Sequence, residues 1–300
     1  MSTLPPAVER LSRLEPADRA AVLDLVAAAE SADKSAPLNE ATLLAMGHPG
    51  ATQAHLVSRD GDRLVGYLQW RAGDDAPADA EVVVAPANRR HGRGGALVTG
   101  ALELSGGDRL RMWSHGDQAG AVVLAGRLGF DRVRELWQLR RALSDLPRNQ
   151  AVGEGITIRP FRPGEDEQAW LALNAEAFAH HPEQGRMTRA DLDERMTASW
   201  FDPRGFFLAE REGTLVGFHW TKVHAGTHPV GEIYVLGVSP EAQGLGLGRT
   251  LTSAGLEHLA SRGLASVMLY VESDNDAANR LYAGLGFHHV STDVQYLSAH

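Results

Sequence analysis

Apolar runs alternate with polar, glycine-containing turns along the whole chain, and one such pattern occurs twice. Residues 232–238 form an apolar, β-branched run of strand length that leads into a glycine-rich segment, and apolar residues then continue at helical spacing over 247–259. The first half repeats this order, with a strand over 81–84, a turn over 89–94 and a helix over 97–104. Each half is therefore predicted to place a strand, a glycine turn and a helix in succession.

Two further landmarks recur in the same order in each half. A polar glycine turn that leads into an apolar strand, which is typical of a hairpin, occupies residues 60–67 and again 211–218. A Leu-Gly-Phe triplet occupies residues 128–130 and 285–287. The recurrence of these landmarks in one order predicts an internal duplication.

The length of the chain agrees with two domains. Its 300 residues exceed what one small core needs, and about 150 residues per domain is usual. A polar stretch with proline and glycine at 144–155 has the composition of a linker. We therefore expect an N-terminal domain over 1–148 and a C-terminal domain over 149–300.

Composition excludes several classes of partner and chemistry. The 38 acidic residues outnumber the 29 basic ones, so the surface repels phosphate backbones and nucleic acid is not expected. No apolar run reaches the roughly 18 residues that cross a bilayer, and the N-terminus does not resemble a signal peptide, so we expect no membrane partner and a cytoplasmic location. Cysteine is absent, which excludes an acyl-cysteine intermediate and favours direct transfer of any acyl group.

The glycine turn at 243–248 is a candidate anion site. Glycines allow backbone N–H groups to approach a ligand closely, and the start of a helix favours negative charge, so a pyrophosphate would fit there. The alternative is a turn that only connects strand and helix. A dinucleotide-binding Rossmann fold is not expected, because each turn lies deep inside its half and no acidic residue closes a second strand at the usual distance.

The two turns resemble the pyrophosphate loop of the Gcn5-related N-acetyltransferases. The pattern reads Gln243-x-x-Gly246-x-Gly248 in the second half and Arg89-x-x-Gly92-x-Gly94 in the first. The resemblance implies an α+β fold with two tandem domains, each a mixed, mostly antiparallel sheet flanked by helices. It also implies acetyl-CoA as co-substrate, with the pantetheine arm inserted between two splayed strands.

Four segments of the second half resemble the mycothiol synthase family more closely: 181–185, 217–222, 234–238 and 269–275. That family transfers acetyl from acetyl-CoA to the cysteinyl amine of cysteinyl-glucosaminyl-inositol. The resemblance implies that this thiol-sugar substrate is contacted by Glu40, Glu183, Lys222, Glu232 and Tyr270.

The same resemblance implies two sets of cofactor-binding residues. In the second half they are Leu236, Gly237, Val238, Gln243, Gly244, Leu245, Gly246, Leu247, Gly248, Arg249, Asn275, Asp276, Ala277, Ala278, Asn279 and Arg280. In the first half they are Val82, Val83, Val84, Arg90, His91, Gly92, Arg93, Gly94 and Gly95.

Glu232 and Tyr282 are the candidate base and acid. An α-amino group with a pKa of about 8 is mostly protonated at pH 7, so a base such as Glu232 is needed before it attacks a thioester. Tyr282 lies on the helix expected over 276–284, where the superfamily often places the acid that protonates the departing thiolate. The alternatives are a solvated carboxylate at a strand end and a core aromatic.

The first half carries alanine at both matching positions, Ala125 for the acid and Ala78 for the base. It is therefore predicted to be non-catalytic. A register slip of one or two residues would instead bring Asp79 or Glu81 to the position of the base.

Other functions remain open at this point. The chain could acetylate another small amine, such as an aminoglycoside, or it could bind CoA as a sensor without turnover. The histidines 219, 224 and 228 share one hairpin, but without cysteine and with no fixed ligand spacing we expect no metal site. We expect a monomer.

Overall fold

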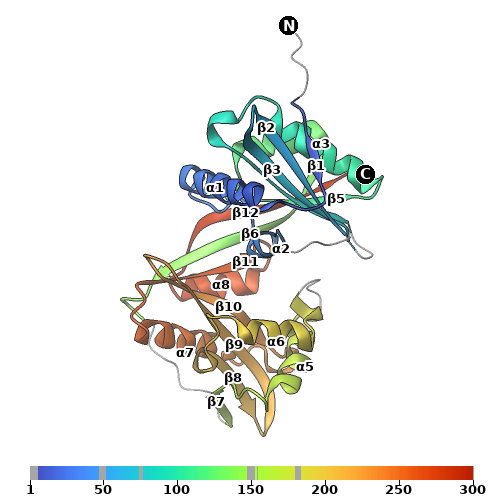
Figure 1. Ribbon diagram of the computed structural model, residues 1–300. Coiled ribbons are helices and arrows are strands. Elements are labelled where there is room, and N and C mark those ends of the chain that lie inside the picture. Colours follow the sequence, from blue (N-terminus) through green and yellow to red (C-terminus); the bar gives the residue numbers. More distant parts are fainter. Residues whose placement is uncertain are drawn as a thin grey trace. The chain divides into compact units, whose positions relative to one another are not determined.

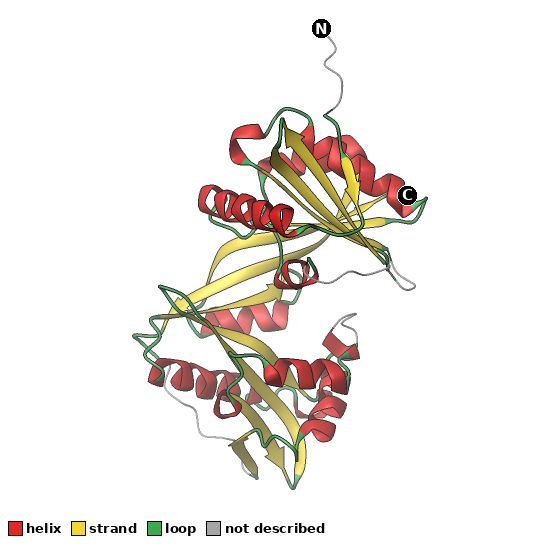
Figure 2. Cartoon of the chain, in the orientation of Figure 1, coloured by secondary structure: helices red, strands yellow, loops and turns green. Residues whose placement is uncertain are grey.

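The computed structural model describes residues 6–46, 52–73, 77–146, 153, 155–179 and 184–299, and it divides into two compact units. Unit 1 comprises Met1–Leu136 with Ser291–His300, and unit 2 comprises Trp137–Val290. Each unit is an α+β structure in which helices pack against a mixed sheet, as predicted (Figure 1; Figure 2).

The sheet of unit 1 runs in the order β1-β2-β3-β4-β5-β12 and is antiparallel except for the parallel pair β4 and β5. Its strands are β1 (Glu9–Leu11), β2 (Gln53–Asp60), β3 (Arg63–Arg71), β4 (Ala78–Val84), β5 (Leu110–Ser114), the first part of β6 (Phe130–Ala142) and the last part of β12 (His288–Ser298). Its helices are α1 (Pro16–Asp33), α2 (Glu40–Ala45), the 3₁₀ turn η1 (Pro86–Asn88), α3 (Arg93–Ser105) and α4 (Ala119–Leu128).

Alternation along β3 gives unit 1 a core on each face of its sheet. Leu68 packs with Leu97 and Ala101 of α3, whereas Tyr67 on the opposite face packs with Val22 of α1. Because successive side chains of a strand point to opposite faces, the two helices cover opposite sides.

The sheet of unit 2 runs in the order β6-β11-β10-β9-β8-β7, in which β10 and β11 are parallel and the pairs from β10 to β7 are antiparallel. Its strands are the last part of β6, β7 (Ile156–Pro160), β8 (Phe206–Arg211), β9 (Thr214–His224), β10 (Val230–Val238), β11 (Ser266–Glu272) and the first part of β12. Its helices are α5 (Glu167–Ala177), η2 (Gln184–Arg186), α6 (Arg189–Thr197), η3 (Pro203–Gly205), η4 (Pro240–Ala242), α7 (Leu247–Ser261) and α8 (Asp276–Gly284).

Unit 2 also has a core on each face of its sheet. One contains Trp170 of α5, packed against Phe218 and Trp220 of β9. The other contains Leu256 of α7, packed with Ile233 and with residues of α8. The order of strand, glycine turn and helix predicted for each half is present in β4–α3 and in β10–α7.

The compact units do not coincide with the two halves of the sequence. The end of β6 lies beside β11 in unit 2, where the N–H of Leu143 donates to the carbonyl of Ala265 at 3.0 Å. The end of β12 pairs with β5 in unit 1, with Tyr296 opposite Met112. Each half of the sequence thus supplies a strand to the unit formed mainly by the other half. The bounds 1–148 and 149–300 describe the two copies of the sequence duplication, and they remain a prediction.

Both predicted hairpins are present. Asp60 pairs with Arg63 across one two-residue turn, and Arg211 pairs with Thr214 across the other. Among the described residues, no helix is long and apolar enough to cross a membrane.

Candidate active site

Strands β10 and β11 of unit 2 separate after two paired positions. Gly231 pairs with Val267 and Glu232 with Met268, and a β-bulge then follows between Ile233 and Val235. Beyond this point, residues 236–238 pair with β9 only. The backbone of these three residues is therefore open on the side that faced β11, and Glu232 occupies the last paired position before the gap.

The glycine turn after β10 presents backbone donors that have no internal partner. Gly244 and Gly246 have φ angles of 80° and 74°, a conformation that favours glycine. The N–H groups from Gly244 to Gly248 donate to no acceptor among the described residues. Because α7 begins at Leu247, its dipole adds to these bare donors, and the turn has the properties of an anion site.

Helix α8 lies beside the start of α7. The Arg249 guanidinium donates to the carbonyl of Gly284 at 3.0 Å, and the Asn275 side chain caps α8 by accepting from the N–H of Ala278. The side-chain amide of Asn279 donates to the carbonyls of Glu272, the last residue of β11, and of Ser273, the next residue. Its Oδ1 is buried and has no hydrogen-bond partner in the part of the chain that the structure describes. The N-terminal part of α8 thus offers an unused acceptor.

Glu232 is buried, with 8% of its surface exposed, so it is not the solvated strand-end carboxylate considered from the sequence. His224 of β9 donates from Nε2 to Oε2 of Glu232 at 2.6 Å. Oε1 has no hydrogen-bond partner among the described residues. One oxygen of this carboxylate is therefore available to take a proton.

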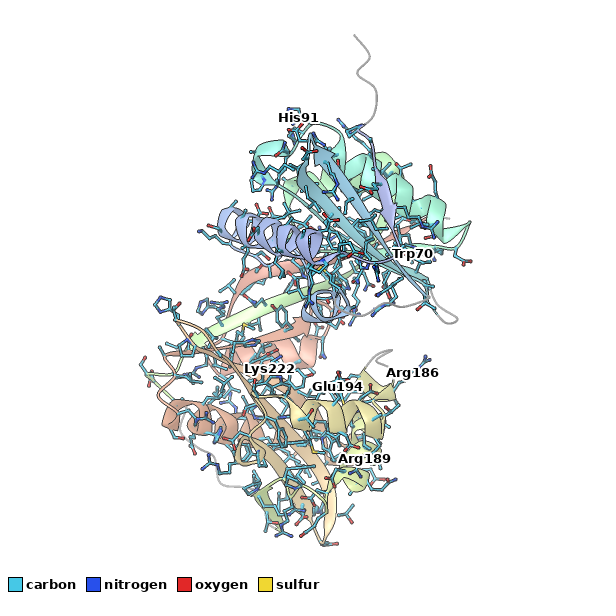
Figure 3. All side chains as sticks on the ribbon, in the orientation of Figure 1. Trp70, His91, Arg186, Arg189, Glu194 and Lys222 are labelled. Atoms are coloured by element: carbon cyan, nitrogen blue, oxygen red, sulfur yellow. The ribbon has the colours of Figure 1, made fainter. Side chains whose placement is uncertain are left out.

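Lys222, labelled in Figure 3, pairs with Glu232 across β9 and β10. Its Nζ is 4.8 Å from the centre of the Trp200 ring and 5.4 Å from that of Tyr234. Arg195 of α6 donates to the Tyr234 hydroxyl at 3.0 Å, which fixes that ring. The cation is 9% exposed, and cation–π attraction stabilises it there.

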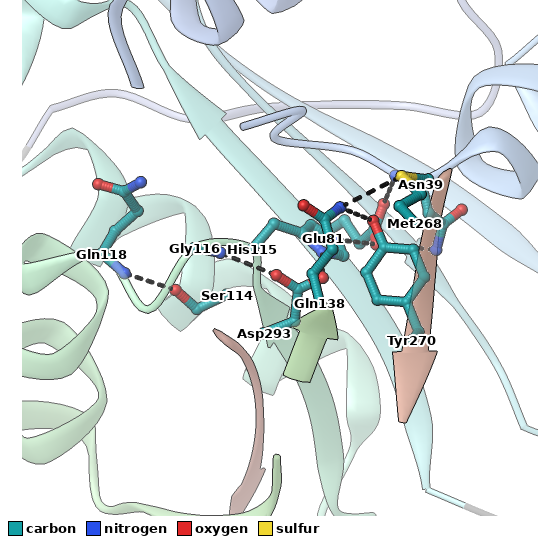
Figure 4. Close-up of polar contacts among 10 residues, drawn as sticks. All are labelled: Asn39, Glu81, Ser114, His115, Gly116, Gln118, Gln138, Met268, Tyr270 and Asp293. Carbon is teal, nitrogen blue, oxygen red and sulfur yellow. Dashed lines mark hydrogen bonds and ion pairs between the residues drawn. The ribbon is translucent and has the colours of Figure 1, made fainter. Parts of the chain in front are cut away.

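Tyr270 of β11 is 43% exposed, and Gln138 of β6 donates to its hydroxyl at 2.8 Å (Figure 4). Gln138 also lies 3.7 Å from the sulfur of Met268 on the same strand. The sequence could not predict this role of Gln138, because the residue reaches Tyr270 only through the position of β6 beside β11 in the sheet.

Tyr282 of α8 is 6% exposed and packs edge to face against Phe287. Burial raises the pKa of its phenol, which keeps the hydroxyl protonated. That hydroxyl has no hydrogen-bond partner among the described residues. Tyr282 belongs to the hydrophobic core and also carries a hydroxyl that donates to no described residue. Its packing is therefore compatible with a core aromatic and with the candidate acid.

Two predicted substrate residues cannot be placed. Glu183 lies outside the described residues, and Glu40 begins α2 with a side chain that the structure does not describe.

Comparisons with known proteins agree with this geometry. The profile of the acetyltransferase (GNAT) family matches residues 169–287. A mycothiol acetyltransferase of Thermobispora bispora is 52% identical over 289 residues, which cover 95% of this chain and 97% of that protein. A mycothiol acetyltransferase of Streptomyces coelicolor is 48% identical over 297 residues, which cover 97% of this chain and 95% of that protein.

This chain belongs to the mycothiol acetyltransferase family. It is also similar to a solved Gcn5-related N-acetyltransferase of Sphaerobacter thermophilus, with a TM-score of 0.77 and 26% identity over 99% of this chain and 96% of that one. A tandem GNAT protein from the clavulanic acid biosynthesis pathway has a TM-score of 0.75 at 22% identity, over 97% and 98% of the two chains, and shares the fold. The predicted family and fold are thus confirmed.

Members of the GNAT family use acetyl-CoA, and unit 2 of this family member has features that fit such a molecule. The bare amides at 244–248 suit a pyrophosphate, and the open edge at 236–238 suits the amides of a pantetheine arm. The unused Oδ1 of Asn279 adds an acceptor.

Unit 1 repeats the same geometry. β4 pairs with β5 only from Ala78 to Ala80, so residues 82–84 are open in the same way, and the N–H groups from Arg90 to Gly95 have no acceptor among the described residues. Arg90 adopts a φ of 65° where unit 2 has Gly244. His91 is exposed on this turn (Figure 3).

Asp79, rather than Ala78, is the counterpart of Glu232 in unit 1. Asp79 lies opposite Arg71 on β3, just as Glu232 lies opposite Lys222 on β9. The alignment of the halves missed this because the bulge in β10 shifts the register by one residue. Unit 1 therefore has a carboxylate at this position, but two hydrogen bonds, of 2.6 and 2.9 Å, join it to Arg111.

A buried ionic cluster lies where β4 and β5 of unit 1 separate (Figure 4). His115 contacts Asp293 of β12 at 2.8 Å and Glu81 at 3.3 Å, and Asn39 donates to Glu81 from both its backbone and its side chain at 2.8 Å. Burial alone would lower the pKa of His115, but its hydrogen bonds to the two carboxylates, and their charges, raise it to about 9. Glu81 is thus engaged in a structural network.

The histidines of the β9–β10 hairpin do not converge. His219 is fully buried and contacts the carbonyl of Leu251, His224 contacts Glu232, and His228 is exposed. Burial lowers the pKa of His219 to about 4, so this ring is neutral. No cluster of three or more potential metal ligands occurs among the described residues.

Proposed function

We propose that this chain is a mycothiol synthase, which transfers acetyl from acetyl-CoA to the cysteinyl amine of cysteinyl-glucosaminyl-inositol. The observation that carries the proposal is the position of Glu232. Its carboxylate, with one unengaged oxygen, lies at the last paired residue before the open edge of β10 and the bare amides of the following turn. Full-length relatives named mycothiol acetyltransferase support the choice of substrate.

In this proposal the turn at 243–249 binds the pyrophosphate, residues 236–238 hydrogen-bond the pantetheine arm, and residues 275–280 complete the cofactor site. Lys222, Tyr270 and Glu232 contact the thiol-sugar substrate, together with Glu183 and Glu40 by family resemblance. Lys222 holds its positive charge beside the Trp200 and Tyr234 rings, on the strand residue that pairs with Glu232.

Glu232 and Tyr282 divide the proton transfers between them. As the nitrogen of the amine forms its bond to the acetyl carbon, Oε1 of Glu232 takes the proton from nitrogen, directly or through one water. As the bond from that carbon to sulfur breaks, Tyr282 donates its phenolic proton to the sulfur. Burial raises the pKa of Tyr282, so the phenol carries its proton before the reaction begins.

Unit 1 is proposed to bind a second acetyl-CoA without turnover, at residues 82–84 and 90–95. Arg111 neutralises Asp79 there, and Ala125 stands in α4 where α8 carries Tyr282. We further propose that the protein acts as a cytoplasmic monomer and needs no metal.

The test is release of free CoA thiol from acetyl-CoA by the full chain, with cysteinyl-glucosaminyl-inositol, an aminoglycoside and simple amino sugars as acceptors. We expect release at least tenfold faster with the cysteinylated sugar. Faster release of CoA with another amine would show that the proposed substrate is wrong. Binding of acetyl-CoA without amine-dependent release of CoA would show that the chain is a CoA sensor and not an enzyme.

A further inference from the structure

The hydrogen bond between His224 and Glu232 gives the histidine a task in the proposed reaction. His224 pairs with Val230, so it lies diagonally across from Glu232 and on the same face of the sheet as Lys222. Its Nε2 is 2.6 Å from Oε2 of Glu232, which is a short distance for such a bond. An ionised carboxylate only accepts hydrogen bonds, so Nε2 carries the hydrogen.

This contact selects one of the two carboxylate oxygens. Oε2 is occupied by the imidazole, and Oε1 has no partner among the described residues. A glutamate side chain has several rotamers, and fixing one of them before substrate binds removes that entropic cost from the reaction. The fixed carboxylate then has one oxygen left to accept a proton.

We propose that His224 is the positioning residue for Glu232: its Nε2–H holds Oε2 so that Oε1 takes the proton of the attacking amine. The proposal rests on the function proposed above. The side chain of His224 is 39% exposed, against 11% for Glu232, so the ring reaches from solvent to a buried carboxylate. No described residue forms a hydrogen bond or ion pair with Oε1, and among the described residues His224 is the one hydrogen-bond partner of this carboxylate.

The experiment compares His224→Gln with His224→Met. Both side chains have a length similar to that of histidine, but only the glutamine amide donates a hydrogen bond. We expect His224→Met to lower kcat about tenfold or more while KM for both substrates stays within about twofold, because the base is misplaced and the binding groups are intact. His224→Gln should keep kcat within about threefold of the native chain.

His228→Ala is the matched control, since this exposed histidine of the same hairpin has no described contact, and it should leave kcat unchanged. Equal kcat values for the Met variant and the native chain, or equal losses in the Gln and Met variants, would overturn the proposal.

A second measurement does not depend on turnover. In the NMR spectrum of the free protein, the Nε2 proton of His224 should give a downfield signal that is protected from exchange with water and is lost in Glu232→Ala. Absence of that signal in the native chain would overturn the positioning role. Its presence in a chain that acetylates no amine would leave the contact in place and refute the proposed function instead.

Discussion

Asp79 and Arg111 form a bidentate ion pair at paired positions of β4 and β5, where unit 2 has Glu232 and Met268. The two units thus share a carboxylate at the same register, and they differ in the residue beside it. Arg111 engages both carboxylate oxygens of Asp79, at 2.6 and 2.9 Å. The Met268 side chain carries no N–H donor, and Oε1 of Glu232 has no hydrogen-bond partner among the described residues.

Transferring the arginine to unit 2 should therefore inactivate it. We expect Met268→Arg to lower kcat at least tenfold, because a guanidinium at this position would engage both carboxylate oxygens, as Arg111 does with Asp79, and leave neither to take the proton. Met268→Gln, of similar length and without charge, is the control and should retain most activity. Equal activity of the two variants would contradict the assignment of Glu232, provided that both show native thermal unfolding.

Removal of the Tyr282 hydroxyl should affect rate more than stability. The hydroxyl makes no hydrogen bond to a described residue, so Tyr282→Phe leaves no internal partner unpaired and keeps the packing against Phe287. We expect kcat to fall about 10²-fold with a change in unfolding free energy below about 1 kcal/mol. An unchanged kcat would mean that Tyr282 is a core aromatic only.

The ionic cluster of unit 1 should make stability depend on pH. The pKa of His115 is raised to about 9 in the folded chain and returns to 6.5 on unfolding. The protonated ring therefore stabilises the fold fully below pH 6.5, and this contribution, at most about 3 kcal/mol, is lost as pH rises from 6.5 to 9.

Thermal unfolding of the native chain and of His115→Gln between pH 6 and pH 9.5 checks this. At pH 6 the native chain should be more stable than His115→Gln, and this difference in stability should narrow steadily as the pH rises toward 9. A difference that does not change with pH would show that His115 is not charged in the folded state.

His219 and Gly255 form a matched pair of a large and a small residue. A Cβ on Gly255 would overlap the His219 ring, whereas Leu68 and Ala101 occupy the same strand and helix positions in unit 1. Gly255→Ala should therefore destabilise the chain by about 1–3 kcal/mol. The double variant His219→Leu with Gly255→Ala should recover most of that loss in urea unfolding, and additive losses would refute the coupling.

Local patterns in the sequence predicted much of the fold. The two-residue hairpin turns, the glycine turns before α3 and α7, and the bounds of α8 all follow from short-range periodicity and turn chemistry. The exchange of β6 and β12 between the units was not predictable, because it is a long-range pairing that leaves no periodic signal.

The same distinction applies to the site. The turn at 243–248 was visible as a glycine motif, but the one-residue bulge after Ile233 was not, and Asp79 was therefore only one of the alternatives. His224 looked like one of several scattered histidines. Its contact with Glu232 depends on the cross-strand register, which the sequence does not reveal.

The most direct test of the account compares the native chain with Glu232→Gln, which keeps the size of the side chain and removes its basicity. We predict that both chains bind acetyl-CoA with the same affinity in calorimetry, because the turn at 243–248 is intact, and that kcat for cysteinyl-glucosaminyl-inositol falls at least 10²-fold in the variant. A kcat within about threefold of the native value would contradict the claim that Glu232 takes the proton of the amine beside the cofactor turn.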